Sequence, residues 1–242
     1  MSKACILIPS RFQSSRFPGK PLAPILGKPM VQWVYENCSQ SGVPTYVVTD
    51  HEGIEKTVLG FGGQVLRVDD DVPSGSQRIA LAYERFLKQH NFEFIINVQG
   101  DEPLLQGSVI KELVAYHAST KFDVTTLVVE RPLTHPAWSD PNVVKAVVGQ
   151  GGRCLYFSRA SLPYDRDGIN KSWNQHVGVY SYRPQSLKAF NDADQSWLAD
   201  CEQLEQLKGM DHGLSYGAHK VVVNLVGVDR PEDIKKVEEL LK

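Results

Sequence analysis

The chain has 242 residues, 42% of them hydrophobic, which is enough to bury one large core. Its 26 basic and 28 acidic residues leave a net charge of −2, so charge gives no overall reason to expect nucleic acid or a membrane as partner. The four cysteines are far apart without a CxxC pair, which favours reduced thiols over a disulfide or zinc framework. With no signal peptide or membrane span predicted, we expect a soluble cytoplasmic protein.

Strands and helices are predicted to alternate through the first half of the chain. Apolar runs predict strands at 4–8, 45–49, 64–68 and 94–98, and helical spacing predicts helices at 30–41, 51–61, 76–90 and 108–119. This alternation is typical of a parallel sheet with helices on both faces.

Beyond residue 122 the predicted strands are separated by loops rather than by long helices. They lie at 124–129, 143–148, 154–157 and 177–182, and are followed by a helix at 195–208, a strand at 220–226 and a helix at 230–241. We interpret this region as antiparallel additions with a projecting lobe. The expected fold is α/β, with a mostly parallel sheet in a single domain, 1–242, and a sub-lobe at about 130–190.

A cationic loop follows the first strand. It contains Arg11, Arg16 and Lys20, with Gly19 beside the last cation, and no carboxylate occurs before Glu36. Cations without nearby counter-charges, next to a glycine that lets the backbone approach a ligand, favour polyphosphate binding over an exposed turn. The loop is not a P-loop, because proline follows Gly19-Lys20 and the upstream glycine is missing. We interpret it as the triphosphate site of a nucleotidyltransferase.

A second candidate loop, Gln99-Gly100-Asp101-Glu102-Pro103, comes directly after the predicted strand at 94–98. Ligands of open parallel sheets bind outside the carboxyl ends of the strands. A carboxylate there suits magnesium, which binds through one or two carboxylates and substrate phosphate oxygens. By spacing alone, a simple acidic turn closed by Pro103 is equally compatible. The acidic run 69–71 favours a solvated turn over a metal site.

Two further segments precede predicted helices. In the segment 227–233, Asp229 and Glu232 match a helix-capping arrangement, which spacing alone favours over a metal ligand although the two roles are compatible. The turn of Ser74, Gly75, Ser76, Gln77 and Arg78 offers amides and hydroxyls suited to a nucleotide, but serine and glycine also cap many helices.

His176 and Tyr180 lie four residues apart in a predicted strand and therefore share a face. A core histidine is the ordinary interpretation of this pair, and a polar substrate pocket is the alternative.

Taken in order, six segments resemble the 3-deoxy-D-manno-octulosonate cytidylyltransferase family, which makes the CMP-sugar used in lipopolysaccharide biosynthesis. They are IPSRFQSSRFPGKPL, VQGDEP, LYFSRASLPYDRD, HVGVYSYR, LEQL and VDRPEDI, and they span nearly the whole chain. The resemblance implies a nucleotidyltransferase fold of the Rossmann-like three-layer type and a cytoplasmic enzyme of Gram-negative bacteria. It also implies a homodimer that forms through the projecting lobe.

The resemblance further implies roles for individual residues. Arg11, Arg16 and Lys20 would hold the phosphates of CTP, and Asp101 and Asp229 would bind Mg²⁺. The turn from Ser74 to Arg78 would contact the nucleotide. The acidic keto-sugar would be met by Gln99, Arg159, His176, Tyr180, Glu205 and Gln206, with Arg159 paired to its carboxylate.

Two departures from the family pattern affect the expected substrate. The family turn has threonine and an acid where this chain has Ser76 and Gln77, and it has arginine where this chain has Lys208. The first change removes a charge, and the second loses the fork geometry of a guanidinium. The same reaction on an 8-amino octulosonate or another acidic keto-sugar is therefore the alternative, and a nucleotide-binding regulator without turnover is a rival from another class.

Overall fold

The structure is a computed structural model that describes residues 3–13, 17–72 and 74–242. It contains two compact units, one formed by Met1–Val114 and Asn224–Lys242 and the other by Ala115–Val223. The second unit includes the predicted sub-lobe at about 130–190 and extends beyond it at both ends. The prediction that the whole chain acts as a single domain stays a prediction.

The first unit is built on a parallel sheet. β1 (Ala4–Pro9) pairs with β4 (Thr45–Thr49) on one side and with β6 (Phe94–Val98) on the other, and β4 pairs with β5 (Val65–Arg67). Every residue of β1 and β6 is buried, so both faces of the sheet are covered, because strand side chains alternate between faces. The four predicted strands are confirmed to within one residue at each end.

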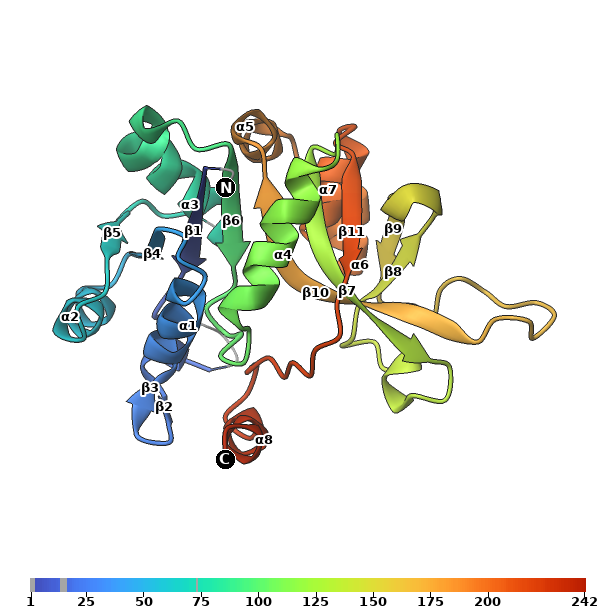
Figure 1. The fold of residues 1–242 in the computed structure, drawn as a ribbon, viewed down its shortest axis with the longest axis horizontal. Coiled ribbons are helices and arrows are strands. Elements are labelled where there is room, and N and C mark those ends of the chain that lie inside the picture. The colour runs from blue at the N-terminus through green and yellow to red at the C-terminus, as the bar shows by residue number, and fades with distance from the viewer. Residues whose placement is uncertain (1–2, 14–16, 73) are drawn as a thin grey trace. The chain divides into compact units, whose positions relative to one another are not determined.

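The helices of this unit connect the parallel strands. They are α1 (Met30–Ser39), which lies in front of the sheet in Figure 1, α2 (Glu52–Gly60) and α3 (Gly75–Ala82). A further helix, α4 (Gly107–Ala118), follows β6, and its last four residues belong to the second unit. The helix predicted at 76–90 is interrupted. Its α-helical part ends at Ala82, and a π-helical turn, η2 (Tyr83–Leu87), and a 3₁₀ turn, η3 (Lys88–His90), follow. The wider turn places both Tyr83 and Leu87 in the core.

The C-terminal helix packs against the segment that follows the cationic loop. A short hairpin of β2 (Pro24–Ile25) and β3 (Lys28–Pro29) comes after the 3₁₀ turn η1 (Lys20–Leu22). A separate apolar cluster of Ile25, Met30, Val228 and Val237, all fully buried, joins this hairpin and α1 to α8 (Asp233–Leu240). This packing holds the residues before α8 close to Lys20.

The strands of the second unit are mostly antiparallel. β10 (Ser172–Tyr182) runs antiparallel to β7 (Val124–Pro132) and to β8 (Lys145–Val148), and β8 runs antiparallel to β9 (Cys154–Ser158). The predicted antiparallel additions are therefore confirmed. The whole fold is α/β, as expected.

One predicted strand lies in the wrong place. The sequence favours a strand at 220–226, but β11 is Tyr216–Lys220, which pairs in parallel with β7. The apolar run that suggested the strand is irregular beyond Val221, and Val222 is fully exposed. The hydrogen bonds that β7 offers decide where the strand forms, and they override the β-propensity of the valines.

The remaining helices also differ from the prediction. The single helix expected at 195–208 is two helices, α6 (Trp197–Glu202) and α7 (Gln206–Asp211), because Gln203 adopts a left-handed backbone with φ of 53°. The helix α5 (Pro184–Asp192) was not predicted, although Pro184 at its first turn and buried Leu187 and Phe190 are typical helix signals. Short 3₁₀ turns occur at η4 (Pro136–Trp138) and η5 (Gln150–Gly152).

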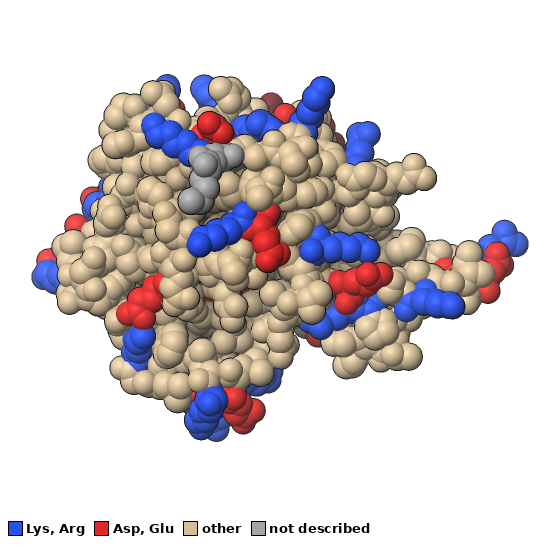
Figure 2. Space-filling view, in the orientation of Figure 1, with Lys and Arg blue, Asp and Glu red and all other residues tan. Residues whose placement is uncertain are grey.

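Charged side chains of both signs are interspersed on the described surface that Figure 2 shows, in keeping with the nearly balanced charge of the sequence. Within residues 3–13, 17–72 and 74–242, no helix is long and apolar enough to cross a membrane.

Candidate active site

A cavity of about 800 Å³ opens in the first unit at the carboxyl ends of its strands. Part of its lining comes from three of these ends: Pro9 to Gln13 at the end of β1, Asp50 after β4, and Gln99 to Asp101 after β6. The cavity therefore lies where open parallel sheets bind their ligands, outside the carboxyl ends of the strands. Its volume suits a ligand of nucleotide size.

Two glycines let the backbone segments of the cavity approach each other. A Cβ on Gly100 would lie 2.9 Å from the Pro9 carbonyl oxygen and 3.1 Å from the Ser10 hydroxyl. A Cβ on Gly75 would lie 3.1 Å from the Pro9 ring. Any larger residue would push the loop after β6, or the start of α3, away from the end of β1.

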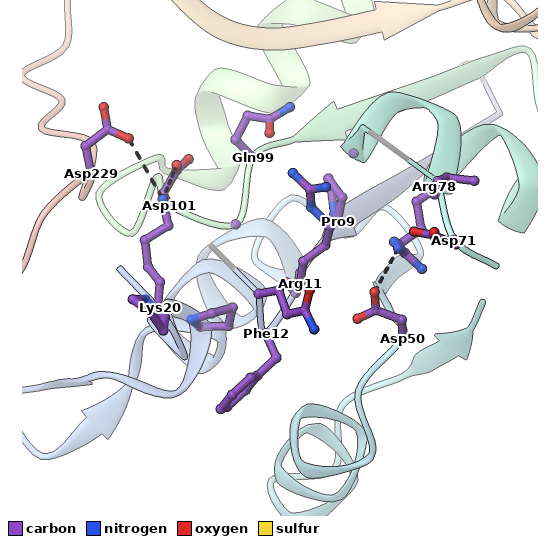
Figure 3. Close-up of a pocket in the computed structure, with 17 residues that line it drawn as sticks. Pro9, Arg11, Phe12, Lys20, Asp50, Asp71, Arg78, Gln99, Asp101 and Asp229 are labelled. Carbon is purple, nitrogen blue, oxygen red and sulfur yellow. Dashed lines mark hydrogen bonds and ion pairs between the residues drawn. The ribbon is translucent and has the colours of Figure 1, made fainter. Parts of the chain in front are cut away.

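Lys20 sits at one end of the cavity, between two carboxylates (Figure 3). Its ammonium group donates to Asp101 Oδ2 at 2.6 Å and to the Val228 carbonyl oxygen at 3.0 Å, and it lies 4.0 Å from Asp229 Oδ1. The expectation that no carboxylate neutralises these cations is therefore wrong for Lys20. The sequence has no acid nearby, but the fold brings one from 81 residues away.

Glu102 lies behind this cluster. One of its carboxylate oxygens is buried without a hydrogen-bond partner among the described residues. Burial, together with the charges of Asp101 and Asp229, raises the pKa of Glu102 to about 8, while Lys20 opposes the shift. Because of this raised pKa, most of the Glu102 carboxyl group is protonated and uncharged at pH 7.

Asp229 does not cap the last helix, and that part of the sequence interpretation is wrong. The helix α8 begins at Asp233, whose Oδ2 accepts hydrogen bonds from the backbone amides of Asp229 at 3.2 Å and Arg230 at 3.1 Å. The carboxylate of Asp229 instead lines the cavity beside Lys20. The local spacing was correct for a capped helix start but identified the wrong acid.

The cationic loop contributes Arg11 and Phe12 to the cavity wall. The Phe12 ring stacks on His51, with ring centroids 4.1 Å apart and planes 11° from parallel, and His51 in turn accepts a hydrogen bond from the amide of Gly53 at the start of α2. The stack therefore ties the loop that carries Arg11 to α2. The prediction for Arg16 lies outside the described residues.

Of the residues from Ser74 to Arg78, some support the start of α3 and others line the cavity. Ser74 caps α3 by accepting from the Gln77 amide at 3.2 Å. Ser76 is buried, and Asn97 Nδ2 lies 3.5 Å from its hydroxyl, so it does not line the cavity. Gly75 and Arg78 do line it.

Arg78 pairs with Asp50, a cavity residue that the sequence analysis missed. The guanidinium Nη2 lies 2.8 Å from Asp50 Oδ2, and Nη1 donates to the Val68 carbonyl oxygen. Asp50 directly follows the strand at 45–49, so the strand-end rule could have identified it.

The acidic run at 69–71 is mostly a set of surface ion pairs. Asp69 pairs with Arg67, and Asp70 makes two bonds to Arg85, at 2.5 and 2.8 Å. Asp71 lines the cavity. Gln99 also lines it and donates from Nε2 to Asn97 Oδ1 at 3.2 Å.

In the second unit, His176 and Tyr180 share a face, with ring centroids 5.5 Å apart. Four residues along a regular strand would separate them by roughly 13 Å. The register of β10 against β7 shifts between Val177 and Tyr180, and this bulge brings the two rings together.

His176 is held in its neutral form. Burial lowers the pKa of His176 to about 3, and its Nε2 lies 3.0 Å from the Thr126 hydroxyl. Burial also raises the pKa of Tyr180 far above its ordinary value, with further contributions from Tyr216 and Glu205. Both side chains therefore act as neutral hydrogen-bonding groups at physiological pH.

Arg159 is anchored to the chain around α6. Its guanidinium donates to the carbonyl oxygens of Glu202 at 2.7 Å, Pro141 at 3.0 Å and Gln203 at 3.2 Å. The Glu202 carboxylate accepts from the Arg159 amide at 2.9 Å. Since a guanidinium has five N–H donors, Arg159 is oriented by the chain and keeps donors that these bonds do not use.

Glu205 and Gln206 lie at the start of α7. Glu205 is close enough to Tyr180 and Tyr216 to raise the pKa of both. The Nε2 of Gln206 and the hydroxyl of Tyr216 are buried without hydrogen-bond partners among the described residues. Tyr216 was not predicted, because nothing in its sequence neighbourhood distinguishes it from a core tyrosine.

The residues that could hold a divalent metal in the first unit are Asp101 and Asp229. One oxygen of each carboxylate lies within 4.0 Å of the same ammonium nitrogen, and both residues line the same end of the cavity. No group of three or more metal-ligating side chains is found in the described residues. Two convergent carboxylates fit Mg²⁺, which completes its shell with water and substrate phosphate oxygens.

Comparison with known proteins shows that nearly the whole chain is similar to cytidylyltransferases. A family model described as cytidylyltransferase matches residues 5–221. A 3-deoxy-manno-octulosonate cytidylyltransferase of Photobacterium profundum is 40% identical over 98% of both chains. An 8-amino-3,8-dideoxy-manno-octulosonate cytidylyltransferase of a Shewanella species is 41% identical over 98% of this chain and 97% of the relative.

Solved structures show the same similarity. A CMP:2-keto-3-deoxy-manno-octonic acid synthetase complexed with CTP superposes with a TM-score of 0.92 at 35% identity, covering 99% of this chain and 98% of the other. A glucose-1-phosphate thymidylyltransferase from Bacillus anthracis superposes with a TM-score of 0.69 at 15% identity, and this similarity shows the fold alone.

Proposed function

The chain belongs to the cytidylyltransferase family, and from this premise we propose that it transfers CMP from CTP to the anomeric hydroxyl of 3-deoxy-D-manno-octulosonate. The products are the CMP-sugar and pyrophosphate, for lipopolysaccharide biosynthesis. The observation that carries the proposal is the cavity whose one end combines the Lys20 ammonium with the carboxylates of Asp101 and Asp229. The name of a full-length relative and the CTP bound to a solved relative support the choice of substrates.

In this proposal Arg11 and Lys20 bind the triphosphate, together with Arg16 of the same loop. Arg11 is exposed on the cavity wall, where its guanidinium can reach phosphate oxygens. Lys20 is held by Asp101 and Val228, and it would exchange part of these contacts for a phosphate oxygen. Fixed cations beside the β- and γ-phosphates stabilise the charge that develops on the leaving pyrophosphate.

Asp101 and Asp229 would hold Mg²⁺ at this end of the cavity. When bound, the ion supplies Lewis-acid stabilisation of phosphate charge and lowers the pKa of a coordinated hydroxyl. Packing of α8 against Ile25 and Met30 fixes the segment of Asp229, and Gly100 allows Asp101 to approach the end of β1. The chain therefore presents both carboxylates in a fixed geometry.

The chemical step is an in-line displacement at the α-phosphorus of CTP. The anomeric oxygen forms a bond to this phosphorus and loses its proton to water, and the bond from the phosphorus to the bridging oxygen of pyrophosphate breaks. The protein contributes positioning and charge neutralisation rather than a covalent nucleophile. Lys20→Ala and Asp101→Ala should each reduce turnover by about two to three orders of magnitude without loss of the fold.

Of the residues that the resemblance assigns to the acidic keto-sugar, Gln99 lies in the first unit and the others lie in the second. Arg159 is oriented by three backbone carbonyls and has donors left for a carboxylate. His176 and Tyr180 present neutral polar groups on one face, and Glu205 and Gln206 contribute from α7. The 8-amino octulosonate is the second candidate substrate, because a relative that is 41% identical carries that name.

We also infer a homodimer in the cytoplasm, where CTP is made. Exposed apolar side chains in the second unit support a contact between two copies: Tyr164 is 83% exposed, Ile169 81% and Leu155 54%. Light scattering of the wild type and of Ile169→Glu tests this contact, and a monomeric wild type would reject it.

The deciding experiment for the function is a panel of pyrophosphate-release assays. It crosses CTP, UTP and GTP with 3-deoxy-D-manno-octulosonate, its 8-amino analogue and sialic acid, with and without Mg²⁺. The proposal expects release that requires CTP, the octulosonate and Mg²⁺ together. Absence of release with every acid would instead favour a nucleotide-binding regulator, and preference for the 8-amino acid would establish the second candidate substrate.

A further inference from the structure

The cavity has a second charged end that the phosphate and metal residues do not use. In Figure 3, Lys20, Asp101 and Asp229 lie on one side, and Asp50, Asp71 and Arg78 lie on the other, with Pro9 and Arg11 between them. If the triphosphate occupies the Lys20 end, as proposed above, the nucleoside extends toward Asp50 and Arg78.

The ion pair at this end is unusual in its burial. The Arg78 side chain is only 2% exposed, whereas that of Asp50 is 32% exposed and lines the cavity. Two of the guanidinium nitrogens bond to Asp50 and to the Val68 carbonyl oxygen, and Nε is buried without an acceptor among the described residues. Removing a guanidinium from water is unfavourable, and a buried ion pair is weak evidence for a purely stabilising role.

The geometry fixes the Asp50 carboxylate rather than the arginine as the group that a ligand can reach. Arg78 Nη2 lies 2.8 Å from Asp50 Oδ2, so the ion pair sets the orientation of the carboxylate. An ionised carboxylate accepts hydrogen bonds and cannot donate them. The far end of the cavity therefore selects a ligand group that donates.

Cytosine and uracil differ in this property at one position. Cytosine has a 4-amino group, which donates and pairs well with a carboxylate, whereas uracil has a 4-oxo group, which only accepts. We propose that the Asp50 carboxylate, positioned by Arg78, accepts a hydrogen bond from the 4-amino group of cytosine and so makes the enzyme select CTP over UTP. This inference rests on the proposed function, since it places the triphosphate at Lys20.

The test is the ratio of kcat/KM for CTP to that for UTP, measured by pyrophosphate release in the wild type and in Asp50→Asn. In the variant, the amide oxygen can still accept from Arg78, and the amide nitrogen then donates toward the 4-oxo group of uracil. We expect the CTP/UTP ratio to fall by about tenfold to a hundredfold. Asp70→Asn is the matched control, since Asp70 pairs with Arg85 and does not line the cavity, and it should leave the ratio unchanged.

Equal losses for both nucleotides in Asp50→Asn would overturn the proposal and indicate that the pair only supports the fold. Arg78→Lys keeps the positive charge but loses the planar geometry of the guanidinium. The CTP/UTP ratio of kcat/KM should therefore fall in this variant, but less than in Asp50→Asn. Calorimetric titration of CTP and UTP without the sugar acid measures the same preference in any variant that lacks turnover. It also separates the two hypotheses, because a wild type that binds CTP selectively but releases no pyrophosphate refutes only the proposed reaction.

Discussion

Replacing Lys20 with methionine should have opposite effects on turnover and on metal affinity. The methionine keeps most of the apolar stem but removes the ammonium that lies 2.6 Å from Asp101 and 4.0 Å from Asp229. Turnover should fall by about 10²- to 10³-fold, because one fixed charge on the transferring phosphates is lost. At the same time, the two carboxylates lose their shared cation.

The gain in Mn²⁺ affinity of Lys20→Met can be estimated from the repulsion between the ammonium and the metal ion. A divalent ion about 4 Å from an ammonium is repelled by about 2 kcal/mol at the dielectric constant of water, which corresponds to a factor of about 30. The water value is appropriate because the carboxylate side chains are 29% and 55% exposed and solvent screens them. Without nucleotide, Lys20→Met should therefore bind Mn²⁺ about tenfold or more tightly than the wild type.

Calorimetric titration with Mn²⁺ gives the affinity directly, and pyrophosphate release gives the turnover. Lys28→Met is the control, since Lys28 pairs with Glu36 at 2.6 Å and does not line the cavity. Unchanged Mn²⁺ affinity in Lys20→Met would show that Asp101 and Asp229 do not hold the ion together. Near-normal turnover would remove Lys20 from the phosphate site.

Three other predictions address the supporting structure. Gly100→Ala should weaken CTP binding at least tenfold in calorimetry, with a smaller effect on octulosonate KM, because its Cβ would lie 2.9 Å from the Pro9 carbonyl oxygen; wild-type CTP affinity would contradict the close-approach argument. Arg159→Lys should raise the KM for the sugar acid more than that for CTP, and an equal change in both would count against a carboxylate contact. His117 is buried and its pKa is lowered to about 4, so the folded state binds its proton less readily than the unfolded state. Stability should therefore fall by about 3 kcal/mol as the pH drops from 6.5 to 4, and urea denaturation of His117→Asn should show a correspondingly weaker pH dependence.

The sequence by itself determined the strands of the first unit and the chemistry of its loops. β1 has no polar side chain, β6 has one, Asn97, and β4 is the mostly β-branched run TYVVT; nearly all of these positions are buried, because both faces of a parallel sheet are covered. Local pattern therefore suffices to find them. The position of two loops at strand ends also selected the segments at 11–20 and 99–103 as candidate sites, and both contribute residues to the cavity.

Tertiary structure decided the features that depend on partners distant in the chain. The β11 strand forms where β7 offers hydrogen bonds, and the contact between His176 and Tyr180 depends on a register shift that no spacing rule reveals. The counter-charge of Lys20 and the partner of Arg78 come from other strand ends, Asp101 and Asp50. Sequence periodicity reports burial along a single element, whereas a charge pair is set by which elements the fold places side by side.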